Sequence, residues 1–224
     1  MKKLVWIMAK SAKHSASCIA GFELLVTNND WSKVEVGNLI RLVSTNDGGS
    51  VPEINLLKGS RWGFMESYDI IECDVIKGTT IGAQSENFII NTATIKWINR
   101  AIPTEQFICD KVSNDLFINN NNRLNRIEYS TLENSFRLVK VNNLTIVKND
   151  YNKVKCNFDF EGRPCYGFAM TDPLYYGLAY PYRAGSAYII ISTSSEVYDQ
   201  TGCAYKFVAK IIPEGVYSRN IKGQ

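Results

Sequence analysis

The sequence contains a single histidine, and this scarcity removes many familiar catalytic arrangements. His14 is the only imidazole in 224 residues, so a Ser-His-Asp triad, a histidine acid/base pair or a paired-histidine metal site would depend on one side chain. It lies in a polar, small-residue segment, residues 10–18, that we expect to be a loop between two apolar runs. A thiolate nucleophile built from Lys13, His14 and Cys18 is one hypothesis for this segment, and a structural loop is the other.

Close cysteine pairs and long apolar segments are also missing. The six cysteines are far apart and form no CxxC pair, which excludes a zinc ribbon and a thioredoxin-type motif. An apolar stretch follows Lys2 and Lys3, but Lys10 and Lys13 interrupt it before it reaches the length of a signal-peptide core. No run of about 18 apolar residues occurs. We therefore expect a cytoplasmic protein with reduced cysteines and no membrane contact.

The motifs that cradle phosphates or hold metals are absent as well. Neither GxxxxGK[ST] nor a GxGxxG that opens a helix is present, and the acidic residues form no EF-hand pattern. We therefore expect no cofactor, no metal and no enzymatic activity. The net charge of +3 permits contact with a polyanion without requiring it, and the Lys and Arg residues are spread along the chain.

The sequence has instead a strong period of two. Short runs rich in β-branched and aromatic residues end at Gly, Asn, Asp or Pro, which predicts an all-β fold. The runs cover residues 3–10, 34–44, 68–76, 88–98, 136–147, 154–160, 166–170, 187–192 and 204–212. The clearest hairpin has Glu161-Gly162 at its turn.

Helical signal is concentrated near the middle of the chain. Pro103-Thr104-Glu105 begins a candidate helix that continues to Val112, and an asparagine tract at 119–122 follows as an expected surface loop. We predict an N-terminal barrel over residues 1–105, a helix-and-loop connector over 106–132 and a C-terminal barrel over 133–224. Each half then holds about five strands, as in a small Greek-key barrel. A single β-sandwich of nine or ten strands is the alternative.

Polar segments at strand ends and a tyrosine-rich loop are the candidate binding elements. The segments 84–87 and 171–173 carry amide, carboxyl and hydroxyl groups that suit a base edge or sugar, or bonds to the nearby backbone. Aromatic rings crowd the loop at 175–182, next to Arg183. Such rings suit stacking with nucleic-acid bases, and they suit protein interfaces and core packing equally well. The loop residues are Tyr175, Tyr176, Tyr180 and Tyr182.

Several short motifs occur in an order that resembles bacterial dual-OB-domain proteins. Ser11, Lys13 and Cys18-Ile-Ala-Gly21 are followed by Arg41-Leu-Val-Ser44 and Gln84-Ser-Glu86-Asn87. Thr171-Asp172-Pro173 and Cys203-Ala-Tyr205-Lys206 come in the second half, so the similarity spans nearly the whole chain. Ser17 and Leu42 depart from the family pattern, which often has an arginine at the first position and a proline at the second.

The resemblance implies two tandem OB-like barrels joined by a short helical and loop connector. It also implies a ligand site made of Ser11, Lys13, Arg41, Ser44, Gln84, Glu86 and Asn87 in the first barrel, and of Thr171, Asp172 and Lys206 in the second. In that site Lys13 and Arg41 would hold phosphate, while Glu86 and Asn87 would contact base or sugar. The implied function is binding of single-stranded DNA or RNA, as an accessory or sensor part of a prokaryotic conflict or anti-phage system.

Two other functions remain open at this point. The chain could instead be an adaptor that docks an effector protein such as a nuclease through strand edges and aromatic loops. It could also be a small-molecule or nucleotide-binding enzyme that uses Lys13, Cys18 and Glu86.

Overall fold

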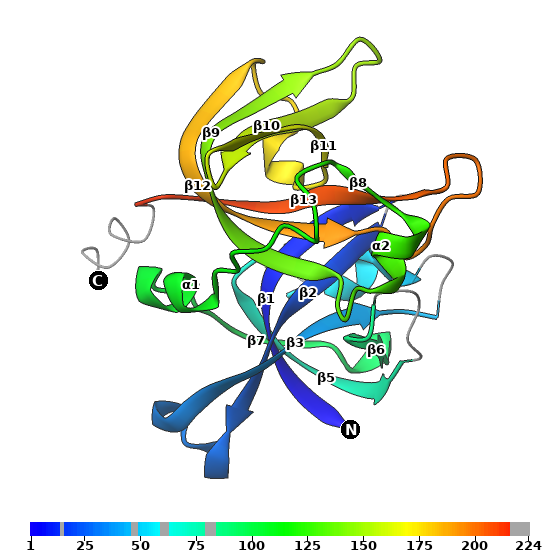
Figure 1. The fold of residues 1–224 in the computed structure, drawn as a ribbon. Helices are drawn as coiled ribbons and strands as arrows, with labels where there is room; N and C mark the ends of the chain where they lie inside the picture. Colours follow the sequence, from blue (N-terminus) through cyan, green and yellow to red (C-terminus); the bar gives the residue numbers. More distant parts are fainter. Residues whose placement is uncertain (14–15, 46–48, 59–62, 79–83, 216–224) are drawn as a thin grey trace. The chain divides into compact units, whose positions relative to one another are not determined.

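The structure is a computed structural model that describes residues 1–13, 16–45, 49–58, 63–78 and 84–215. Strands dominate it, so the expected all-β class is confirmed. The described residues divide into two compact units (Figure 1). The first contains residues up to 78 together with 86–102, and the second contains 84–85 and all described residues from 103 onward.

The first unit is a closed barrel. Its strands are β1 (Lys2–Lys13), β2 (Ala16–Val26), β3 (Val34–Val43), β4 (Val51–Pro52), β5 (Asp69–Lys77), β6 (Asn87–Ile90) and β7 (Lys96–Arg100). Short 3-10 turns are η1 (Thr27–Asn29), η2 (Trp31–Lys33), η4 (Glu53–Leu56) and η5 (Thr92–Thr94). Neighbours in the sheet follow the order β1-β2-β3-β6-β5, and β5 pairs back onto β1 to close the barrel. The β3–β6 pair is parallel, β4 pairs with β2, and β7 lies outside β5.

Alternating apolar side chains fill this barrel. Val5 and Ile7 of β1, Ile19 of β2, Leu42 of β3 and Ile71 of β5 all lie in one buried cluster. Their spacing of two residues within a strand is the pattern that predicted strands from the sequence.

One glycine sets how closely the first two strands approach. A Cβ at Gly21 would overlap the backbone carbonyl oxygen of Trp6, because β1 bulges beside this position. Only glycine leaves room for that approach.

The second unit has a short helical segment before its barrel. Its helices are α1 (Glu105–Lys111) and α2 (Arg126–Ser130), with the 3-10 turn η6 (Pro173–Tyr175). Its strands are β8 (Arg123–Asn125), β9 (Phe136–Lys148), β10 (Val154–Phe160), β11 (Arg163–Met170), β12 (Tyr182–Thr193) and β13 (Cys203–Pro213). Thr104 accepts a bond from the Phe107 amide at the start of α1, which confirms the predicted helix.

The second barrel repeats the connectivity of the first. Its order is β9-β10-β11-β13-β12, β12 pairs back onto β9, and the β11–β13 pair is parallel. In both barrels the first three strands are sequential neighbours, the fourth returns to the first, and the fifth runs parallel to the third. The prediction of two tandem OB-like barrels is therefore confirmed for the described residues, and the single β-sandwich is wrong.

Two predicted segments differ from the structure. The expected loop at 10–18 belongs largely to strands, since β1 continues to Lys13 and β2 begins at Ala16. Small polar residues misled the prediction, because Ser11 and Ser17 lie opposite Cys18 and Ala12 in a regular antiparallel pair. The single run at 88–98 is instead two strands, β6 and β7, separated by η5.

Candidate functional site

Arg41 and Glu86 form an ion pair at the parallel β3–β6 junction of the first barrel. The Arg41 amide donates to the Glu86 carbonyl oxygen at 2.9 Å, and Arg41 Nε lies 3.8 Å from Glu86 Oε1. Their side chains are only 8% and 5% exposed, and buried Asn87 lies opposite Arg41 in the strand register. The structure thus brings three predicted site residues together, but the Glu86 carboxylate already neutralises the Arg41 charge.

The predicted serines of the first barrel have local roles. Ser44 Oγ donates to the carbonyl oxygen of Ser50, and the Ser44 amide donates to the Gly49 carbonyl at 3.0 Å. Ser11 is buried on β1 opposite Cys18. The Ser44 contacts hold the backbone of the barrel where a ligand contact was expected.

Another predicted residue of this group is assigned to the second unit, and the side chain of a further one is not described. Gln84 is buried but belongs to the second unit, although its neighbour Glu86 belongs to the first. His14 and the side chain of Lys13 lie outside the described residues. The nucleophile hypothesis needs both residues, so the structure does not test it.

The main charged cluster of the first barrel surrounds Asp69, and sequence reasoning missed it. This carboxylate is fully buried and accepts bonds from Lys58 Nζ at 2.8 Å, Trp97 Nε1 at 3.2 Å and the Glu66 amide at 2.7 Å. Arg100 Nη1 lies 3.4 Å from it. Because the partners come from two loops and from β7, no local sequence pattern marks the cluster. We infer that this cluster stabilises the barrel, because both carboxylate oxygens of Asp69 already face donors of the barrel itself.

Thr171 and Asp172 fasten the end of β11 in the second barrel. Asp172 accepts bonds from the Leu174 amide at 3.2 Å and the Ile211 amide at 3.3 Å, and Lys210 Nζ lies 3.2 Å away. The Asp172 side chain is 1% exposed. Thr171 Oγ1 donates to a carbonyl oxygen of β13. Both residues therefore stabilise the end of the strand and the following turn through hydrogen bonds to backbone groups. This was the alternative interpretation of the segment.

Lys206 is a buried link between the barrel and the segment that precedes it. Its Nζ donates to the Leu116 carbonyl at 2.8 Å, the Asn119 carbonyl at 2.6 Å and Asn119 Oδ1 at 3.1 Å. Burial lowers the pKa of Lys206 to about 8, against the opposing attraction of Glu128 and Asp115. The expected ligand contact at Lys206 is thus occupied by the protein's own backbone, and the asparagine tract supplies part of that backbone.

The tyrosine loop is largely folded upon itself. Tyr180 Oη donates to the Tyr175 carbonyl at 2.6 Å, and Tyr176 Oη donates to the Met170 carbonyl at 3.1 Å. Tyr175 and Tyr182 meet edge to face, with ring centroids 6.0 Å apart. The packing interpretation of this loop therefore accounts for most of its rings.

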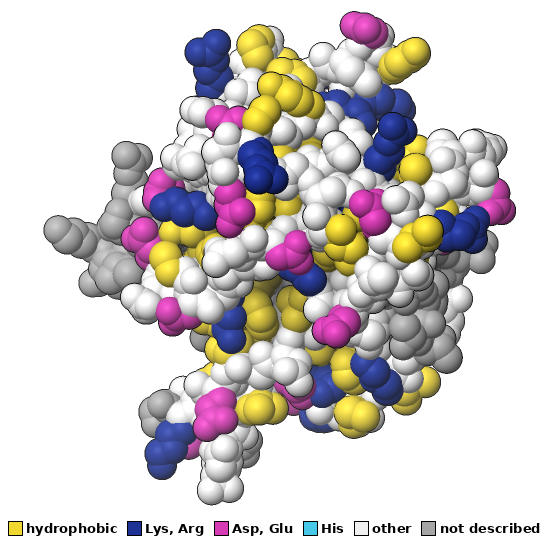
Figure 2. All heavy atoms as spheres, in the orientation of Figure 1, with side chains coloured by type: hydrophobic (Ala, Val, Ile, Leu, Met, Phe, Trp, Pro, Cys, Tyr) yellow, Lys and Arg dark blue, Asp and Glu magenta, His cyan; other side chains and the backbone are white. Residues whose placement is uncertain are grey.

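The outer surface of the β10–β11 hairpin carries the exposed aromatic and basic groups that the sequence did not reveal. Tyr151, in the β9–β10 loop, and Tyr166, on β11, are 82% and 67% exposed, the two highest values among the described tyrosines. Lysine and arginine side chains also occur on β9, β10, β11 and the loop, and acidic side chains alternate with them along the chain. We call this surface the hairpin face; its residues are Lys148, Tyr151, Lys153, Lys155, Arg163 and Tyr166. Figure 2 shows basic side chains over the region where Figure 1 labels β10 and β11.

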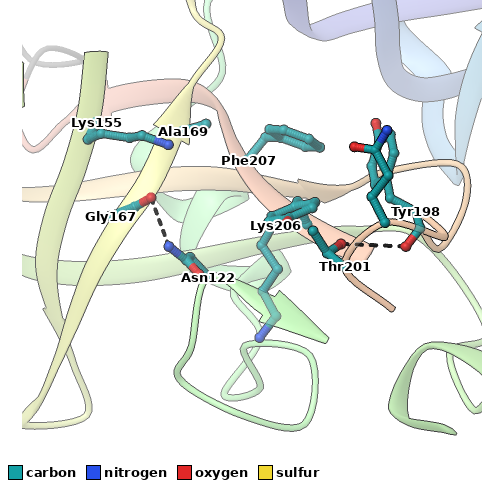
Figure 3. A pocket seen from close by; sticks show the side chains of 10 residues that line it. Asn122, Lys155, Gly167, Ala169, Tyr198, Thr201, Lys206 and Phe207 are labelled. Atoms are coloured by element: carbon teal, nitrogen blue, oxygen red, sulfur yellow. Dashed lines mark hydrogen bonds between the residues drawn. The ribbon is translucent and has the colours of Figure 1, made fainter. Parts of the chain in front are cut away.

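A pocket of about 340 Å³ lies beside the hairpin face (Figure 3). It is formed by β10, β11, β13, the β12–β13 loop and one residue that precedes β8. The lining residues are Asn122, Lys155, Gly167, Ala169, Tyr198, Gln200, Thr201, Tyr205, Lys206 and Phe207. In Figure 3 the Lys206 chain passes below the pocket and its ammonium points away from it, whereas Phe207 points to the opposite side of β13. The alternation in 204–212 could have indicated that Tyr205 and Phe207 face outward, but not that a loop encloses them.

The cysteines offer little chemistry in this structure. All six are free thiols, and Cys73, Cys156 and Cys165 are buried. Burial raises the pKa of Cys73 to about 12, with Asp74 and Glu72 adding to the effect. A thiol with so high a pKa is a weak nucleophile at neutral pH.

Within the described ranges, no group of three or more His, Cys, Asp or Glu side chains is arranged to hold a metal ion. Neither helix in the part of the chain that the structure covers has the length and hydropathy of a membrane span.

A comparison with known protein families gives a match over most of the chain. A family model described as a dual OB-containing domain matches residues 3–211. No curated protein and no solved structure matches the chain at a significant level.

Proposed function

The chain belongs to the family of dual OB-containing domains, and from that premise we propose that it binds single-stranded DNA or RNA through its second barrel. OB barrels bind oligonucleotides and oligosaccharides on the face of their second and third strands and on the adjoining loops. In the second barrel these strands are β10 and β11, and the first loop is the β9–β10 loop. The observation that supports the proposal is that the two most exposed tyrosines described, Tyr151 and Tyr166, lie on these elements.

The chemistry of the hairpin face suits a single strand better than a duplex. Bases stack on exposed aromatic rings only when they are unpaired, and each such contact contributes about 1–3 kcal/mol. Lys153 and Lys155 can neutralise phosphates, because neither forms an ion pair with a carboxylate of the described residues. The acidic side chains Asp150, Asp159 and Glu161 share these segments, so we expect base stacking to contribute more than phosphate contacts.

Truncation of one tyrosine tests the proposal. Tyr166→Ala should weaken binding of a fluorescein-labelled 12-nucleotide single strand about tenfold, since it removes one stacking platform worth about 1.4 kcal/mol. Fluorescence anisotropy at about 50 mM salt measures the affinity, and the logarithm of the association constant should fall with the logarithm of salt, with a slope near −2 if about three phosphates are neutralised.

Trp31→Ala is the matched control, because Trp31 is a 46% exposed aromatic side chain of the first barrel. It should leave the affinity unchanged. Failure of the wild-type protein to bind DNA or RNA single strands at low salt would show that the proposal is wrong.

One observation favours docking of an effector protein as a second candidate function. On the first barrel, Leu25 and Trp31 are each 46% exposed beside a groove of about 610 Å³ that Lys2, Lys3, Glu23 and Glu72 also line. Exposed aromatic and aliphatic side chains with a charged rim are typical of protein interfaces. A partner that wild-type protein retains in high salt and that Trp31→Ala loses would support this function over the first.

The chain would bind without catalysing a reaction, in the cytoplasm, as an accessory or sensor component of an anti-phage or related conflict system. A phage-challenge assay in cells that carry the gene, with and without Tyr166→Ala, tests whether binding and defence are linked.

A further inference from the structure

The pocket beside the hairpin face combines three chemical groups that a nucleotide requires. Tyr198 and Tyr205 pack with ring centroids 5.6 Å apart and line the pocket together with Phe207. Gln200, whose side chain ends in an amide, and Lys155, whose side chain ends in an ammonium group, also line the pocket. Aromatic faces stack on bases, an amide can both donate to and accept from a base edge, and an ammonium group holds phosphate.

The polar groups of the pocket are available to a ligand. Gln200 is exposed on the β12–β13 loop, and no hydrogen bond to another described residue occupies its amide. Lys155 likewise forms no ion pair with a carboxylate in the described ranges. By contrast, the Lys206 ammonium group is fully engaged by Leu116 and Asn119 and cannot serve a ligand. The cation of this pocket is therefore Lys155.

Small residues bring the backbone close to the pocket. Gly167 and Ala169 of β11 line it, and Gly167 has a φ of +72°, a conformation that favours glycine. Asn122 Nδ2 donates to the Gly167 carbonyl at 3.0 Å, and a Cβ on Gly167 would lie 3.0 Å from that nitrogen. A glycine inside a strand often marks a site that a ligand approaches closely. Here it keeps the surface flat enough for a planar ring.

The size of the pocket limits its occupant. At about 340 Å³ it is near the lower end of the range for small-molecule sites. It therefore suits one base with its sugar better than a dinucleotide cofactor. Because the pocket shares Lys155 with the hairpin face, a strand that lies across that face can place one nucleotide in it.

We propose that this pocket receives a single unstacked base of the bound strand and distinguishes one base from another through the Gln200 amide. The inference rests on the proposed function, which assigns strand binding to the hairpin face. It adds a sequence preference, whereas stacking on Tyr151 and Tyr166 alone would tolerate every base. A site that hydrogen-bonds one base edge rejects the edges that leave its amide unpaired.

The test compares oligonucleotides with equal numbers of phosphates. The probes are 12-nucleotide strands of dA, dC and dT and a 12-nucleotide abasic strand, each labelled with fluorescein. Wild-type protein should bind one of the three base-containing strands about tenfold more tightly than the abasic strand and measurably more tightly than the other two. Phe207→Leu should reduce the advantage over the abasic strand to about twofold. Gln200→Ala should equalise the affinities for the three bases.

Tyr166→Ala separates failure of this inference from failure of the proposed function. If Tyr166→Ala weakens binding while Phe207→Leu and Gln200→Ala bind as wild type does, the hairpin face binds the strand and the pocket inference is wrong. Gln200 lies in an exposed loop, so its variant should fold even if Phe207→Leu does not.

If no strand binds, nucleotide titrations test separately whether the pocket binds a base. AMP, CMP, GMP and UMP would be added separately to wild-type protein, and the amide NMR signals of Gly167 and Thr201 would be followed. A shift that Gln200→Ala abolishes would support the pocket although the proposed function had failed. No shift with any of the four would overturn both.

Discussion

Replacing Lys206 with methionine should lower the free energy of unfolding of the second barrel by about 3 kcal/mol. The Lys206 ammonium group donates to three oxygens of Leu116 and Asn119, and hydrogen bonds from charged groups contribute about 1.5–3 kcal/mol each. Methionine preserves the length of the side chain but leaves these oxygens without their donor. Urea unfolding followed through amide NMR signals of β9 and β13 measures the change in the second barrel.

The same lysine should give the wild-type protein a distinctive pH dependence. Its folded-state pKa of about 8 lies below its ordinary value of 10.5, so the folded protein loses this proton first. Between about pH 8 and 10.5 the unfolded chain binds more protons at this group, so the Lys206 contribution to the free energy of unfolding should rise with pH. Burial raises the pKa values of the Cys73 and Cys165 thiols, which oppose this trend above about pH 9 in wild type and variant alike. The free energy of unfolding of the wild-type protein minus that of Lys206→Met should therefore rise over this interval, and below pH 8 Lys206 contributes no slope.

Lys155→Met is the matched control for both measurements. Lys155 is half-buried on β10 of the same barrel and forms no ion pair with a described carboxylate. Its replacement should change the free energy of unfolding by less than about 0.5 kcal/mol. Equal stability of the two methionine variants would contradict the assigned role of Lys206.

Asp69→Asn should destabilise the first barrel by about 3 kcal/mol. Asparagine has nearly the same shape, but it removes the charge that Lys58 and Arg100 face at 2.8 and 3.4 Å. Because the Lys58 side chain is only 15% exposed, water cannot fully replace the lost carboxylate, and loss of one partner of a buried pair typically costs about 3–5 kcal/mol. Because the Arg100 side chain is partly exposed, we expect the loss of stability to lie at the lower end of this range.

Tryptophan fluorescence during urea unfolding measures this effect selectively, since all four tryptophans precede residue 103. Glu66→Gln is the control, because the Glu66 side chain is 62% exposed and lies 4.0 Å from Arg100. An exposed pair contributes little, so its variant should unfold near the wild-type urea concentration. If Asp69→Asn also does so, the Asp69 cluster is not a source of stability.

The strands of both barrels could be predicted because their cores depend on a local alternation. The run 154–160 matches β10, and its inward residues Cys156, Phe158 and Phe160 are all buried. Prediction failed where polar residues occupy a strand, as Ser11 and Ser17 do. There β1 and β2 are stabilised by pairing with each other. The alternation of hydrophobic residues along one strand does not reveal such pairing.

The candidate site was harder to predict because its residues are joined by tertiary contacts. Lys206 was singled out as a ligand contact, but its acceptors lie 87 and 90 residues away in the sequence. Lys155 and Tyr166 were not singled out, since neither belongs to a motif. Lys155 pairs with Ala169, but the register of β10 and β11 shifts between Cys156 and Phe158, so strict alternation along β11 does not predict where exposed Tyr166 points. Sequence alone indicated which residues were polar, but not which of them the fold had already engaged.

The place of the last strand in each barrel also imposes an order on biosynthesis. The first barrel has all its strands once Arg100 has been made, whereas the second cannot close until β13, which ends at Pro213, is complete. At a translation rate of about 5–20 residues per second, the two events are separated by roughly 10 s. Once β11 has been made, it has an unpaired edge on the side that β13 will occupy until β13 is complete.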